Sequence, residues 1–115
     1  MKTRSSSRIR TVAKGSCKSP RGFSWDIDFN DLSEGGCRVD DPRHGMELGA
    51  LVRLFIAGTG PHHAEVAWRQ GDRVGLEFVK PLSQRVFTLL AHERWDEARA
   101  ISHTEVTRYP VRRVM

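Results

Sequence analysis

The clearest pattern in the chain is an alternation of large apolar and polar residues over 23–30. Phe23, Trp25, Ile27 and Phe29 are separated by Ser24, Asp26, Asp28 and Asn30. A period of two residues predicts a β-strand, here with four large side chains on one buried face. The β-branched segment 9–13 predicts a short strand before it, and the turn-forming residues of 14–22 are expected to bound that strand.

Further short strands are expected along the middle of the chain. Residues 37–39 follow a polar turn, and 51–56 form an apolar run of strand length. Residues 64–68 and 74–78 predict a hairpin around a turn at 70–72. Short strands with turn residues every eight to twelve positions are typical of a small barrel or sandwich.

The pattern changes to a helical period after residue 82. Ser83 is a suitable N-cap, and apolar residues then recur at helical spacing: Phe87, Leu90, Ala91, Trp95 and Ala98. This predicts one amphipathic helix of about four turns, packed over the β-structure. The expected organisation is a basic arm at 1–8, a folded domain at 9–100 and a basic tail at 101–115.

Composition limits the chain to one globular domain. It has 115 residues, of which 38% are hydrophobic and 29% charged. We find no apolar run near the ~18 residues that a membrane span needs. Serines at 5–7 occupy the place where a signal peptide would be apolar, so a cytoplasmic protein is expected.

The sulfur and imidazole groups give no metal motif. Cys17 and Cys37 lie twenty residues apart, without the short paired spacing of a zinc site, and we expect both to be reduced thiols. His62 and His63 are neighbours, so on a strand their rings would point to opposite faces. We assign this pair to a solvated loop and expect no metal.

Positive charge is concentrated at the amino end. The net charge is +5, and seven basic residues precede Asp26, the first acid: Lys2, Arg4, Arg8, Arg10, Lys14, Lys18 and Arg21. Such a distribution suits a polyanionic partner, whether nucleotide phosphates, nucleic acid or an acidic protein surface. A solvated tail would have the same composition.

Two motifs give the charge a more specific interpretation. Residues 31–36 read Asp-Leu-Ser-Glu-Gly-Gly, a DxSxxG turn, and residues 4–8 read Arg-Ser-Ser-Ser-Arg, an RxxxR motif. Alone, the first could be a turn that caps a strand. Together, and with Gly75-Leu76-Glu77-Phe78 closing the hairpin, they resemble the PilZ domain family of bacterial cyclic di-GMP receptors over residues 4 to about 95.

The resemblance implies a mainly β fold, a six-stranded antiparallel β-barrel with a C-terminal amphipathic α-helix. It also implies a cyclic di-GMP site without any cofactor. The residues implied are Arg4, Arg8, Asp31, Ser33 and Gly36, with Arg10 and Gly35 as secondary contacts. Arginine forks can grip phosphate oxygens or pair with guanine O6 and N7, and the carboxylate can accept from guanine N1–H and N2–H₂.

The expected mechanism is an N-terminal arm that closes over the nucleotide against the DxSxxG turn, with the changed surface read by a partner protein. Three alternatives remain open. The domain could be a protein-interaction adaptor that binds no nucleotide. A nucleic-acid-binding barrel would use Arg10, Lys14, Lys18 and Arg21, but the aromatic residues of 23–29 are expected in the core. An enzyme is least favoured, because Asp31, Ser33 and His44 lack the spacing of a triad with an oriented base.

Overall fold

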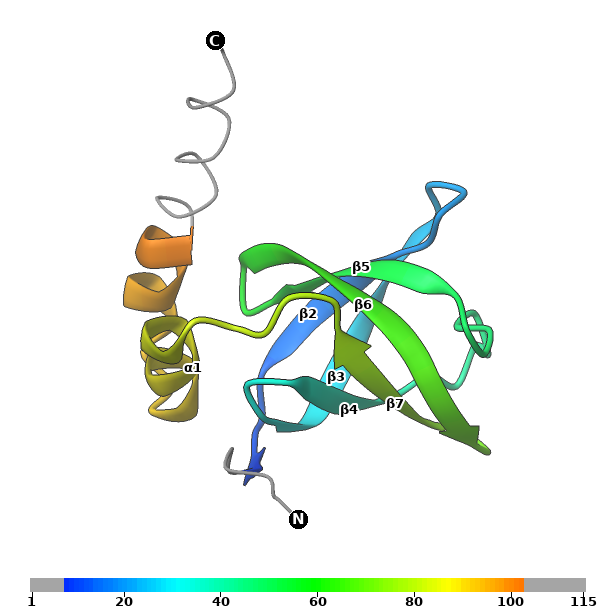
Figure 1. Cartoon of the computed structure of the whole chain (residues 1–115), viewed down its shortest axis with the longest axis horizontal. Coiled ribbons are helices and arrows are strands. Elements are labelled where there is room, and N and C mark those ends of the chain that lie inside the picture. The colour runs from blue at the N-terminus through cyan, green and yellow to red at the C-terminus, as the bar shows by residue number, and fades with distance from the viewer. Residues whose placement is uncertain (1–7, 103–115) are drawn as a thin grey trace, which may run out of the picture.

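The computed structural model describes residues 8–102 of the chain. It contains seven strands and a C-terminal helical region (Figure 1). The strands are β1 (Ile9–Arg10), β2 (Lys14–Lys18), β3 (Ser24–Leu32), β4 (Gly36–Asp40), β5 (Leu51–Ile56), β6 (Thr59–Gln70) and β7 (Arg73–Phe78), followed by helix α1 (Gln84–Ala91).

Six of these strands close into an antiparallel barrel. The hydrogen-bonded order is β3-β2-β5-β6-β7-β4, and β4 pairs back onto β3. Closure leaves no free edge on these six strands, which removes a common route to aggregation. The predicted six-stranded barrel is therefore confirmed. The two residues of β1 add to the end of β3, with Ile9 opposite Leu32 and Arg10 opposite Asp31.

The first barrel strand is β2, in a segment expected to be turns. Its residues pair with β3 on one side and β5 on the other. A Cβ at Gly15 would lie 1.8 Å from the carbonyl oxygen of Phe55, so glycine lets the two strands approach here. Pairing on both sides outweighs the weak strand propensity of Lys-Gly-Ser. Of the strand expected at 9–13, only the two residues of β1 form.

The core is built from the inward faces of the strands. Ile27 and Phe29 of β3 are buried, as their alternation predicts, and Trp25 packs partly against the core. Phe23 is 68% exposed, because it precedes the strand, so the expectation of four buried residues was wrong for it. Both cysteines are buried free thiols, Cys17 in β2 and Cys37 in β4.

The histidine pair was also misassigned. His62 and His63 lie within β6 and not in a loop. The Nε2 atom of His62 is 2.8 Å from the hydroxyl of Thr59, and its ring centroid is 6.0 Å from that of Phe78. Burial, with a smaller effect from His63, lowers the pKa of His62 to about 4.

The predicted helix is present but divided into two pieces at one end of the barrel (Figure 1). Ser83 caps α1 as expected, since its hydroxyl accepts from the amide of Val86. Glu93 has a φ of 59°, its amide donates to Leu90 and the next amide, of Arg94, donates to Leu89. These bonds form a Schellman motif that ends α1. A second helical segment begins at residue 95 and continues to 102.

Candidate functional site

The site begins at Asp31, where the barrel register brings arginines to a buried carboxylate. Asp31 is opposite Arg10 on β1 and opposite Arg38 on β4. Nη1 of Arg8 donates to Oδ1 at 2.5 Å, and Nε of Arg38 donates to Oδ2 at 2.6 Å. The two arginine side chains are 44% and 40% exposed, whereas that of Asp31 is 8% exposed. One carboxylate thus holds two solvent-facing guanidinium groups.

These contacts decide the charge of Asp31. Burial raises the pKa of the carboxyl, but hydrogen bonds from Arg38 and Arg8 and their positive charges outweigh burial and hold it below 3.8. Asp31 is therefore ionised at neutral pH. Both ion pairs are charge-assisted hydrogen bonds, the stronger kind, and they orient the planar donor groups of both arginines.

The turn after Asp31 is fixed by its own side chains and by the barrel. The hydroxyl of Ser33 accepts from the amide of Gly36 and lies 3.2 Å from its carbonyl oxygen. A Cβ at Gly36 would lie 2.3 Å from the carbonyl oxygen of Leu76, so this glycine is required by packing against β7. Gly35 faces open space. The turn is a rigid support for the groups around it.

The same turn is bonded to the chain that leads into α1. The carbonyl of Gly35 accepts from the amide of Phe78 at 2.8 Å, and that of Glu34 accepts from the amide of Leu82 at 2.9 Å. Leu82 directly precedes the helix cap, Ser83. A change in the turn would therefore reach the start of the helix through two backbone hydrogen bonds.

A depression of about 600 Å³ lies beside this turn. It is lined by Arg8, Ser33 and Arg38 on one side and by strands β6 and β7 on the other, where Trp68 is the large side chain. The indole lies across Gly75, whose Cβ would be 2.1 Å from Nε1. A half-buried indole beside two guanidinium groups provides a flat apolar surface on which a base can stack.

Arg38 and Trp68 were missed by the sequence analysis. Arg38 is the second residue after the DxSxxG turn, and Trp68 faces Gly75 in the hairpin that the sequence did predict. The hairpin register alone would have placed the indole over a glycine. Nothing in the motif spacing relates either residue to Arg8, because that relation depends on barrel closure.

A second depression of about 450 Å³ shares Arg38 with the first. It is lined by Arg10, Thr11, Val12, Asn30, Asp31, Arg38, Arg73 and Glu93. Arg10, a secondary contact in the sequence analysis, therefore lies on this side of the Asp31–Arg38 pair. The first depression is lined by Arg8, Ser33, Gly35 and Gly36, whereas Asp31 lines the second.

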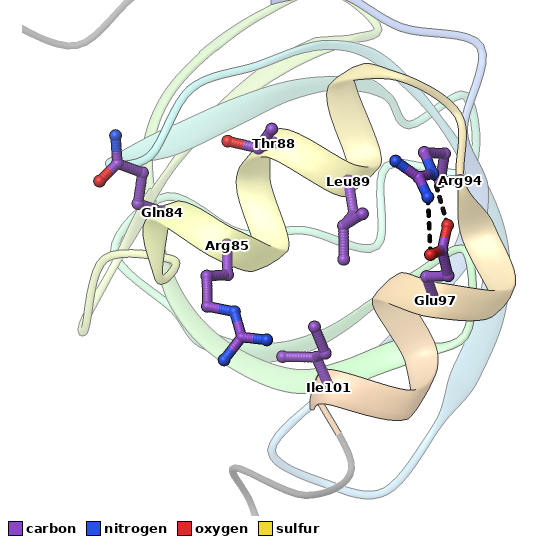
Figure 2. A pocket seen from close by; sticks show the side chains of 7 residues that line it. All are labelled: Gln84, Arg85, Thr88, Leu89, Arg94, Glu97 and Ile101. Carbon is purple, nitrogen blue, oxygen red and sulfur yellow. Dashed lines mark hydrogen bonds and ion pairs between the residues drawn. The ribbon is translucent and has the colours of Figure 1, made fainter.

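A third hollow lies between the two helical segments (Figure 2). Leu89 of α1 and Ile101 of the second segment line it, and Arg94 and Glu97 form an ion pair at its rim. The remaining charged group is Arg85. Its lining combines apolar side chains with one ion pair and one further arginine, so it is a mixed surface and not a pair of arginines held by one carboxylate.

The remaining sequence candidates fall elsewhere. Arg4 lies outside the described residues. His44 contacts Arg69 and Asp72, and the hydroxyl of Ser33 is hydrogen-bonded within its own turn. The catalytic triad considered from the sequence, with His44 as its base, is therefore not assembled. Within residues 8–102 no group of three His, Cys, Asp or Glu side chains could hold a metal ion. No helix in that range is long and apolar enough to span a membrane.

The fold and the site define a class of small β-barrel domains with an arginine-rich outer site. The family model for the PilZ domain matches residues 2–93, and the chain belongs to this family. PilZ domains are binding and adaptor domains associated with cyclic di-GMP. A search of curated proteins gave no match.

Proposed function

We propose that this domain binds cyclic di-GMP in the depression between the DxSxxG turn and Trp68, and passes the signal to a partner protein. The observation that supports it best is the pair of guanidinium groups held by one carboxylate at the rim of a depression. Such an arrangement suits an anionic ligand with planar hydrogen-bonding edges. The depression has a volume of about 600 Å³, which is within the usual range for small-ligand sites.

Each residue has a distinct role in the proposed complex. Arg8 and Arg38 bind phosphate oxygens or guanine O6 and N7, and a guanine stacks on Trp68. Asp31 orients both arginines and can accept from a guanine edge where Arg8 turns onto the ligand. Ser33 and Gly36 hold the turn in place, and Arg4 adds a second guanidinium from the arm. Binding needs no cofactor and no catalytic step.

Calorimetric titration with cyclic di-GMP, GTP and cyclic di-AMP tests the proposal. Saturable binding is expected for cyclic di-GMP, with much weaker binding of the other two. Arg8→Ala and Arg38→Ala each remove charge-assisted bonds worth roughly 1.5–3 kcal/mol, so affinity should fall about ten- to 150-fold. Arg85→Ala, an exposed arginine on α1, is the matched control. Parent-like affinity in both site variants would refute the site.

The second candidate is an adaptor that binds proteins without any nucleotide. The hollow between the helical segments favours it, because it offers the apolar side chains of Leu89 and Ile101 at the surface (Figure 2). This alternative predicts no change in amide chemical shifts on addition of cyclic di-GMP. A change in the amide chemical shifts of the 31–36 turn on addition of cyclic di-GMP would exclude this alternative.

A further inference from the structure

The second depression is built from outward-facing arginines on neighbouring strands. Arg10, Asp31, Arg38 and Gly75 are consecutive cross-strand partners on β1, β3, β4 and β7. Arg73 precedes Gly75 by two residues and so points to the same side of β7. Adjacent strands lie about 4.8 Å apart, so three guanidinium groups are gathered over a small area of the outer surface.

The charge of this cluster is only partly balanced. Arg38 is engaged by Asp31. Among residues 8–102, the side chains of Arg10 and Arg73 make no ion pair, although each is exposed and lines the same depression. Thr11 and Asn30 add a hydroxyl and an amide to the lining. Two unpaired guanidinium groups facing one space favour an anion there.

We propose that this depression is a second anion-binding subsite, which takes a phosphate group between Arg10, Arg38 and Arg73. This proposal rests on the proposed function only because the subsite shares Arg38 with the nucleotide site. Phosphate binding to the subsite can be measured without any nucleotide. Arginine forks bind phosphate oxygens through paired N–H donors, which a hydrated monovalent anion such as chloride uses less well.

Glu93 sets the strength of this subsite. It is the one carboxylate of the lining besides Asp31, and no ion pair within the described residues neutralises it. A negative charge facing the depression repels a bound phosphate. Removing the charge should therefore tighten binding, whereas removing an arginine should weaken it. Glu93 also joins the two helical segments, so an anion in the subsite acts directly on the helix junction.

The test is titration of the full chain with inorganic phosphate at low, constant ionic strength, followed by NMR of the arginine Nε–H groups. Saturable shifts at Arg10 and Arg73 are expected. Arg73→Ala should weaken binding about ten-fold or more, Glu93→Gln should strengthen it, and Arg85→Ala should leave it unchanged. The proposal fails if phosphate does not saturate, if Arg73→Ala matches Arg85→Ala, or if Glu93→Gln does not strengthen binding.

Two sources could supply the phosphate group, and cyclic di-GMP separates them. If one of its phosphodiesters fills the subsite, phosphate competes with it and Arg73→Ala lowers its affinity. If free phosphate is the ligand, both bind together and Arg73→Ala changes only phosphate affinity. Should cyclic di-GMP not bind at all, the proposed function fails while the phosphate titration still decides the subsite.

Discussion

The smallest functional unit of this domain is the carboxylate of Asp31 with its two arginines. Its side chain has little exposed surface, and each of its oxygens already accepts from a guanidinium group. A carboxylate has about four lone-pair positions, so a guanine edge could still bind. Asp31 can therefore act by positioning arginines, by reading guanine, or by both, and these roles have different consequences.

Asp31→Asn separates the two roles. The amide keeps the shape but has only one acceptor oxygen and no charge, so Arg8 and Arg38 lose their shared anchor. If positioning dominates, affinity for cyclic di-GMP and cyclic di-AMP should fall by a similar factor, about ten-fold or more. If Asp31 reads guanine, only cyclic di-GMP should weaken. Calorimetric titrations of the variant with both dinucleotides decide between the two roles. Unchanged affinity for cyclic di-GMP and for cyclic di-AMP would contradict both roles.

His62 should make the stability of the fold depend on pH. Its pKa is about 4 in the folded chain and near 6.5 in the unfolded chain, so the unfolded state binds more protons between these values. Stability should fall as pH drops from about 6.5 to 4. In His62→Gln this part of the pH dependence should be reduced, as measured by urea unfolding at several pH values.

The control for this experiment is His63→Gln, the exposed neighbour on the same strand. It should keep most of the parent's decline in stability over the same range. If His62→Gln retained the full decline, groups other than the imidazole of His62 would be responsible. Asp31 acts in a lower range, because folding lowers its pKa: its contribution is present above the ordinary carboxyl pKa and is lost as pH falls through the lower folded pKa.

Among the elements, the junction between the helical segments is the most unusual. The C′ position of a Schellman motif usually holds glycine, because the left-handed conformation costs other residues about 1–2 kcal/mol. Here Glu93 occupies it with a φ of 59°. A strained residue that also lines a cationic depression indicates that its carboxylate has a role beyond ending the helix.

Glu93→Gly should relieve the strain and raise the free energy of unfolding by about 1 kcal/mol. Glu93→Gln, which keeps the strain but not the charge, should leave it nearly unchanged. Denaturant unfolding of both variants beside the parent is the measurement. A glycine variant less stable than the glutamine variant would show that the backbone here is not strained.

The sequence predicted those elements whose local pattern agrees with their environment. The 64–78 hairpin and the Ser83 cap follow from alternation and side-chain chemistry, and the barrel from the family resemblance. Strand β2 was missed because pairing on both sides, and not its own residues, makes it a strand. The helix break was missed because no glycine marks it. Arg8 near Asp31 was expected from the motifs, whereas Arg38 and Trp68 needed the register.

At the scale of the whole molecule, a buried ion pair fastens the β4–β5 loop to the hairpin of β6 and β7. Nη1 of Arg69 is 3.2 Å from Oδ2 of Asp41 and 2.6 Å from the carbonyl oxygen of Met46. Asp41 has no exposed surface, and its Oδ2 also accepts from the amide of Met46. One carboxylate therefore holds the β4–β5 loop against the end of β6.

Arg69→Met would leave the carboxylate of Asp41 buried without its counter-charge. Breaking a buried pair in this way usually lowers the free energy of unfolding by about 3–5 kcal/mol, so the midpoint of urea unfolding should shift to a much lower urea concentration. The double variant Asp41→Leu with Arg69→Met should recover part of the loss, because no buried charge remains. A single variant as stable as the parent would show that the pair does not hold the loop.

The shortness of β1 also fixes how far the amino-terminal motif can reach. Ile9 pairs with Leu32, so Arg8 lies next to this anchoring point, and Arg4 precedes Arg8 by four residues. Four extended residues span at most about 14 Å, so the proposed contact of Arg4 with the ligand must lie within that distance of Arg8. The number of residues between the two arginines therefore limits the proposed site. Inserting residues between Arg4 and Arg8 would lower the effective concentration of Arg4 at the proposed site while leaving Arg8 in place.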